Sequence, residues 1–133
     1  MAKLYMLDTD MASYVIRGTD PRLLEKFTRN FSKLCISSIT ASELQFGAAK
    51  RNSMPLTEKV DAFCALLPVK DWNFEAALRY GKLRAELDKA GTPLVTMDLL
   101  IAASALAEGA ILITNNEAHF SKVKHLLLEN WLA

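Results

Sequence analysis

Three acidic residues stand alone in apolar segments of the sequence. Asp8 directly follows the apolar run 4–7, and Glu43 is the only charged residue between positions 34 and 49. Asp98 is the only charged residue between positions 92 and 107. An ionised carboxylate in apolar surroundings is costly unless something compensates its charge. If these carboxylates meet, a divalent cation relieves their repulsion, and hard oxygen ligands suit Mg²⁺ or Mn²⁺.

Each acid also has an ordinary structural explanation. Asp8 can cap a helix that begins near Met11, and Asp98 can cap its own helix. Glu43 can be a solvated helix residue. For any one acid alone we favour that explanation, but for three acids that are each isolated in an apolar segment we favour a metal site.

Short apolar runs typical of buried strands alternate with helical patterns along the chain. We expect strands at 4–7, 34–37, 68–70, 110–114 and 126–128, and helices at 11–16, 21–31, 39–50, 55–67, 74–89 and 97–108. The alternation predicts an α/β fold with three α/β/α layers and a parallel sheet of five strands, or of four if the last run is not a strand. Such sheets carry their sites beyond the carboxyl ends of the strands, where Asp8 lies.

The composition fits one folded domain over residues 1–133. Of its 133 residues, 51% are hydrophobic and 23% are charged, which excludes a disordered chain. The net charge of +1 neither indicates nor excludes a nucleic-acid partner. No signal peptide and no apolar run long enough for a membrane span are visible, so we expect a soluble, cytoplasmic protein.

The cysteines and histidines predict no structural zinc site. Cys35 and Cys64 are far apart in the sequence and are expected to be buried free thiols. The chain has no Cys/His cluster of the kind that binds zinc. His119 and His125 are expected to lie on the surface or behind the residues of a site.

Four sequence blocks carry a family resemblance. They are Leu7-Asp8-Thr9-Asp10, then Ile36–Leu44 followed by Gly47, then Asp98–Ala105, and finally Leu112–Asn116 followed by Phe120. Each block alone is weak, but four in order at compatible spacing are specific. The chain resembles the PIN-domain ribonucleases, and among them the VapC-type toxins of bacterial type II toxin–antitoxin pairs, over essentially its whole length.

The resemblance implies a PIN-like domain that is a Mg²⁺-dependent endoribonuclease, with Mn²⁺ able to substitute. Asp8, Glu43 and Asp98 would be catalytic, with the metal held by Asp8 and Asp98 and with Glu43 nearby. The expected substrate is RNA, commonly tRNA, and we expect initiator tRNA cut in its anticodon stem-loop. The expected partners are a small VapB-type antitoxin that neutralises the toxin and a second copy of the chain in a homodimer.

One position departs from the family pattern. Many PIN domains carry a fourth acid where this chain has Asn116, which supplies only a neutral oxygen for weak or water-mediated contact. Glu117 is adjacent and can substitute, but we expect one firmly held metal and not two. Thr9 and Thr114 are expected to orient the site through their hydroxyls, although each can equally satisfy local backbone at a strand end.

Contact with RNA phosphates requires cations. Lys50, Lys82 and Arg84 are candidates for contact with RNA or with the antitoxin. A solvated helix face explains most such cations equally well, and only Arg84 is singled out by the family resemblance.

Three alternatives come from other protein classes. Asp8 and Asp10 resemble the nucleophile motif of haloacid dehalogenase phosphatases, which also need a later acid pair where this chain has asparagines. A receiver-like module would need Asp71 as its phosphoacceptor and would leave Glu43 and Asp98 without a role. A non-catalytic PIN-like binding domain fits Asn116, although the three acids argue against it.

Overall fold

Five parallel strands form one sheet in the computed structural model, which describes residues 3–132. The strand order is β3-β2-β1-β4-β5, with β1 at the centre. The strands are β1 (Tyr5–Leu7), β2 (Leu34–Ser37), β3 (Val69–Lys70), β4 (Ile111–Ile113) and β5 (Leu128–Glu129). The prediction of a five-stranded parallel sheet is confirmed.

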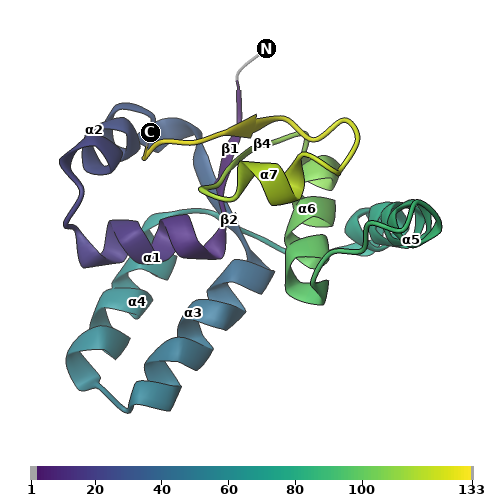
Figure 1. The fold of residues 1–133 in the computed structure, drawn as a ribbon. Coiled ribbons are helices and arrows are strands. Elements are labelled where there is room, and N and C mark those ends of the chain that lie inside the picture. Colours follow the sequence, from purple (N-terminus) through teal and green to yellow (C-terminus); the bar gives the residue numbers. More distant parts are fainter. Residues whose placement is uncertain (1–2, 133) are drawn as a thin grey trace.

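Helices cover both faces of this sheet, so the predicted three layers are confirmed. The helices are α1 (Thr9–Arg17), α2 (Pro21–Arg29), α3 (Ser38–Arg51), α4 (Met54–Leu66), α5 (Phe74–Lys89), α6 (Thr96–Glu108) and α7 (Glu117–Phe120), with a 3-10 turn at Phe31–Lys33. Figure 1 shows α1 to α4 on one side of the sheet and α5 and α6 on the other.

The side chains of β1 show how the sheet divides two cores. Tyr5 and Leu7 pack with residues of α1 to α4, whereas Met6 packs with residues of α5 and α6. Successive strand side chains point to opposite faces, and all three residues are buried. The end of β1 is therefore enclosed on both sides, and Asp8 follows it immediately.

Helix caps set where the chain leaves the sheet. Asp8 caps α1 by accepting from the Met11 amide, and Ser37, the last residue of β2, caps α3 by accepting from the Ile39 amide. Gly109 ends α6 with a φ of 65°, a left-handed conformation that glycine adopts without strain. Because β1 and β2 are parallel neighbours, the caps at Asp8 and Ser37 place the starts of α1 and α3 at the same edge of the sheet.

Several boundaries differ from prediction by one or two residues, and one short helix was missed. The first helix begins at Thr9 and not near Met11, because Asp8 provides its cap. The last strand is Leu128–Glu129 and not 126–128, because Leu126 turns into the core before the pairing with β4 starts. The helix α7 was not predicted, since four residues are too few to show a helical pattern.

Among residues 3–132, no helix combines the length and apolar character needed to cross a membrane.

Candidate active site

Asp8 lies at the centre of the carboxyl edge of the sheet. Its amide donates to the Ile113 carbonyl at 3.0 Å, which fixes its backbone between β1 and β4. Its Oδ1 atom accepts from the Met11 amide at 2.8 Å. The residue is only 6% exposed. The expected capping role is therefore present, and it does not explain why an acid is buried there, since Asn or Ser caps a helix as well.

The burial of Asp8 makes its ionised form costly. Burial raises its pKa from 3.8 to about 6, although hydrogen bonds from the Thr114 hydroxyl and the Met11 amide act to lower it. The charges of Asp10 and Asp98 raise this pKa further. A cation beside this carboxylate would favour its ionised form and offset the repulsion from the other two aspartates.

Asp98 lies in the first turn of α6, where its side chain is 31% exposed. It does not cap its own helix, because the N-cap position is Val95 and no side chain bonds there. The His119 Nε2 atom lies 3.0 Å from its Oδ2 atom. Burial raises the pKa of Asp98, the contact with His119 lowers it, and the charge of Asp10 raises it.

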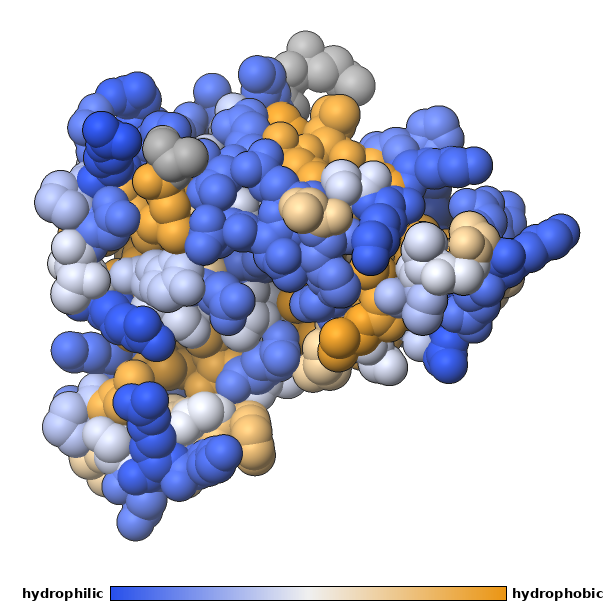
Figure 2. All heavy atoms as spheres, viewed as in Figure 1, coloured by the Kyte–Doolittle hydropathy of each residue, from blue (hydrophilic) through white to orange (hydrophobic). Residues whose placement is uncertain are grey.

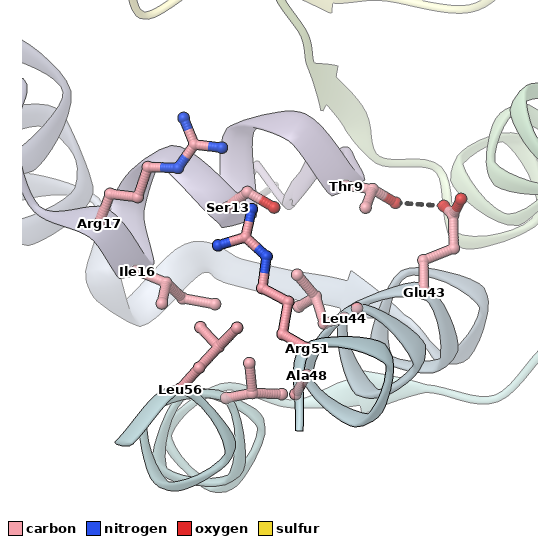
Figure 3. A pocket seen from close by; sticks show the side chains of 11 residues that line it. Thr9, Ser13, Ile16, Arg17, Glu43, Leu44, Ala48, Arg51 and Leu56 are labelled. Atoms are coloured by element: carbon pink, nitrogen blue, oxygen red, sulfur yellow. Dashed lines mark hydrogen bonds between the residues drawn. The ribbon is translucent and has the colours of Figure 1, made fainter. Parts of the chain in front are cut away.

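Glu43 reaches the site through Thr9. The Thr9 hydroxyl donates to Glu43 Oε1, as Figure 3 shows, and it lies 3.3 Å from the Thr40 hydroxyl. Glu43 is half-buried, so it is not a freely solvated helix residue. Because Thr9 follows Asp8 directly, this bond ties the start of α1 to α3.

The acids do not form a closed cage. Within residues 3–132, no three acidic, histidine or cysteine side chains lie close enough together to hold a metal ion by themselves. Mg²⁺ does not require such a cage, because it is commonly held by one or two carboxylates and keeps several waters. The mutual repulsion of Asp8 and Asp98 fits such an open site.

Asn116 and Glu117 are exposed at the start of α7. The Asn116 amide donates to the Thr114 hydroxyl at 2.9 Å, and its carbonyl accepts from the His119 amide at 3.1 Å. Within the described chain, no hydrogen bond or ion pair joins the side chain of Asn116 or Glu117 to the three acids. Asn116 therefore shapes the turn through its backbone, and its metal contact stays a prediction.

His119 and Asp10 also belong to the acidic site, although they were not among the predicted site residues. The sequence placed His119 on the surface or behind the site, and the structure puts its ring directly against Asp98. Asp10 entered only as part of the phosphatase alternative, yet its charge acts on both Asp8 and Asp98. The sequence did contain a signal for both residues. His119 follows the fourth strand within a few positions, and Asp10 follows the first strand in the same way.

The predicted cations lie apart from the acids. Arg84 is exposed on α5 and donates to the Tyr80 hydroxyl at 3.0 Å. Lys82 lines a shallow cavity of about 300 Å³ together with Arg79 and Lys124. Lys50 is exposed near the end of α3. No ion pair joins any of them to the three acids among the described residues.

Comparison with known proteins decides the family. Residues 5–126 match the PIN domain. Ribonuclease VapC2 of Haemophilus influenzae is 39% identical over 129 residues, which cover 96% of this chain and 98% of that protein. The tRNA(fMet)-specific endonuclease VapC of Salmonella typhimurium is 36% identical over 128 residues, which cover 96% and 97%. The chain belongs to the VapC family of PIN-domain proteins.

Solved structures of VapC family members share the fold. VapBC2 from Rickettsia felis, bound to a DNA fragment from its promoter, has a TM-score of 0.89 at 35% identity and covers 96% of this chain and 98% of that one. DNA-bound VapBC from Salmonella typhimurium also has a TM-score of 0.89 at 35% identity and covers 98% and 99%. Membership in the VapC family removes the phosphatase and receiver alternatives.

Proposed function

We propose that this chain is a metal-dependent endoribonuclease toxin that cleaves tRNA in the cytoplasm and is neutralised by a VapB-type antitoxin. The observation that carries the proposal is the burial of the Asp8 carboxylate at the carboxyl edge of the sheet, close enough to Asp98 for the two negative charges to repel each other. Buried acids with raised pKa values and a specific charged neighbour are typical of functional sites. The names of the relatives, Ribonuclease VapC2 and tRNA(fMet)-specific endonuclease, support RNA as the substrate.

Asp8 and Asp98 would hold one Mg²⁺, or Mn²⁺ in its place, with Glu43 nearby. When bound, the ion supplies positive charge to the scissile phosphate and lowers the pKa of a water. The protein contributes orientation. The Met11 amide and the Thr114 hydroxyl fix the Asp8 carboxylate.

Glu43 and Asp98 are each held by a neighbouring side chain. The Thr9 hydroxyl donates to Glu43, and the His119 ring lies against Asp98. In this proposal Glu43 accepts a hydrogen bond from the attacking water. These contacts preorganise the acids before RNA arrives.

The proposed substrate is initiator tRNA, cut in its anticodon stem-loop. The name of the Salmonella relative, tRNA(fMet)-specific endonuclease VapC, supports initiator tRNA as the substrate. Lys50, Lys82 and Arg84 are exposed and would neutralise phosphates at a distance from the cut.

The decisive experiment compares Asp8→Asn, Asp98→Asn and Asp71→Asn. Each change removes one carboxylate charge, and Asp71 is an exposed aspartate outside the site. We expect the first two proteins to fold and to lose Mg²⁺-dependent cleavage of initiator tRNA, whereas Asp71→Asn cleaves like the wild type. EDTA should abolish the wild-type reaction. Retained cleavage in either site variant would overturn the assignment.

We also propose that the chain forms a homodimer. Phe74, Leu78, Val95 and Met97 are exposed apolar residues on α5 and at the start of α6. Figure 2 shows apolar surface near this part of the molecule. Exposed apolar patches commonly mark protein interfaces. Light scattering should find a dimer of the wild-type chain and a monomer of Phe74→Glu, and a monomeric wild-type chain would contradict the proposal.

A further inference from the structure

A cavity of about 200 Å³ opens between α1, α3 and α4, and Glu43 is the one acid of the predicted site that lines it. Thr9 and Glu43 stand at one end, and the side chains of Arg17 and Arg51 extend over the other (Figure 3). Pockets that take a whole small-molecule ligand are larger, at roughly 300–1,000 Å³. This cavity therefore suits one unit of a chain that continues outside it.

The two arginines give their end of the cavity a positive charge, away from the end that Glu43 lines. Arg17 and Arg51 are exposed, and neither forms an ion pair with a carboxylate within residues 3–132. The Arg17 guanidinium lies 5.5 Å from the centre of the Tyr14 ring. The Ser13 side chain lines the cavity between them (Figure 3). Guanidinium groups bind phosphate through paired N–H donors, so an anionic group is the matching ligand.

The floor of the cavity is apolar. Ile16, Leu44, Leu56 and Val60 line it beneath the arginines. An inorganic anion alone would gain nothing from such a floor. A nucleotide has both parts, because its phosphate is charged and its base presents an apolar face.

Gly47 forms part of the wall of the cavity. A Cβ atom built at Gly47 would meet no atom within 4 Å, so no close approach within the chain requires glycine there. Glycine in a helix interior is destabilising relative to alanine. Gly47 lies inside α3, and the space that a side chain at this position would enter is next to the cavity.

We propose that this cavity is the subsite for the nucleotide next to the scissile phosphate of the RNA. Arg17 and Arg51 hold the phosphate of that nucleotide, and its base rests on the apolar floor. The inference rests on the proposed ribonuclease function. An RNA strand is favoured over a protein partner because the same cavity is lined by Glu43 of the proposed catalytic site and by two exposed arginines that match a phosphate.

The test measures binding apart from cleavage. All variants carry Asp98→Asn, and a fluorescein-labelled initiator tRNA transcript is titrated in EDTA at several salt concentrations. Arg17→Ala and Arg51→Ala remove the phosphate contacts, and Gly47→Leu fills the cavity. Arg29→Ala is the matched charge control, since Arg29 pairs with Glu25 on α2. Gly81→Leu is the matched glycine control, since a Cβ atom at Gly81 on α5 also meets nothing within 4 Å.

We expect each arginine variant to bind the tRNA about tenfold more weakly and to lose about one unit of salt dependence. Gly47→Leu should weaken binding by a similar factor while its circular dichroism stays that of the wild type. Arg29→Ala and Gly81→Leu should bind normally. Unchanged binding in all three cavity variants overturns the subsite and leaves the cavity to a protein partner.

The same titration separates this inference from the function on which it rests. A protein with its native Asp98 that neither binds nor cleaves the tRNA overturns the proposed function and the subsite together. A native protein that cleaves, with cavity variants that bind as it does, overturns the subsite alone.

Discussion

The His119 ring joins the short helix α7 to the first turn of α6 through a contact of 3.0 Å with the Asp98 carboxylate. A carboxylate can only accept in such a contact, so the imidazole donates. The contact restricts the Asp98 side chain, and within residues 3–132 no other side chain forms an ion pair with its carboxylate. His119 is therefore a positioning residue for Asp98.

His119→Ala should reduce tRNA cleavage about 10- to 100-fold, which is typical when the partner of a metal ligand is lost. His119→Gln keeps a donor at this position and should recover part of the rate. Single-turnover cleavage at several Mg²⁺ concentrations measures the effect, and the loss should shrink as Mg²⁺ increases. Equal rates in the wild type and His119→Ala would exclude a positioning role.

The free energy of unfolding of the metal-free protein should fall as pH rises. Burial raises the pKa of Asp8 from 3.8 to about 6, so the folded chain binds this proton more tightly than the unfolded chain. The stabilisation from this proton is therefore complete below about pH 4, declines between about pH 4 and 6, and is absent above that range. The change amounts to about 3 kcal/mol and can be followed by urea unfolding in EDTA.

Asp8→Asn is the control for this pH dependence. Asparagine caps a helix about as well as aspartate, so α1 keeps its cap while the buried charge disappears. The variant should lose the part of this decline that Asp8 causes, with a smaller part left to Asp98, whose pKa burial also raises, and it should be more stable than the wild type at pH 7. A wild-type curve that is flat through this range would show that Asp8 is not desolvated.

Thr9→Val should weaken cleavage without unfolding the protein. Valine has nearly the same shape as threonine but cannot donate to Glu43, so the Glu43 carboxylate loses the bond that links it to the Asp8 segment. We expect a loss of about tenfold in the rate, and Thr9→Ser should restore it. A cleavage assay together with thermal unfolding checks both parts, and a matched drop in stability would indicate a purely structural role.

Ser104 and Ser37 should contribute unequally to stability. The Ser104 hydroxyl donates to the Ser37 hydroxyl at 3.0 Å, and both residues are buried. Ser104→Ala removes this one bond and should cost about 1 kcal/mol. Ser37→Ala also removes the cap of α3 and leaves the Ser104 hydroxyl unpaired, so it should cost about 2 kcal/mol. Urea unfolding measures both, and equal losses would contradict this account.

The main elements of the fold were predictable because their patterns are local. The strands β1, β2 and β4 consist mainly of apolar residues, and several helices have a side-chain cap or Pro at their start and Gly or Asn at their end. Isolation in apolar segments also identified Asp8, Glu43 and Asp98. Their catalytic roles stay predictions, although the structure places Asp8 and Asp98 within reach of each other's charge.

The parts that were missed depend on tertiary contacts. The position of His119 follows from a single helical turn after Asn116, which leaves no periodic pattern in the sequence. The cavity beside Glu43 joins side chains from three helices, and its arginines look like ordinary exposed cations along the chain. The open space beside Gly47 depends on the positions of residues that are distant in the sequence, so the sequence alone does not indicate it.

The central position of β1 has a consequence for the synthesis of the protein. Tyr5 pairs with Ile111, so the strand that carries Asp8 gains one of its two neighbours only when most of the chain exists. Asp98 and His119 also lie in the last third of the sequence. Contacts between distant parts of a chain form late in folding. A growing polypeptide on the ribosome thus remains without its assembled acids until translation is nearly finished.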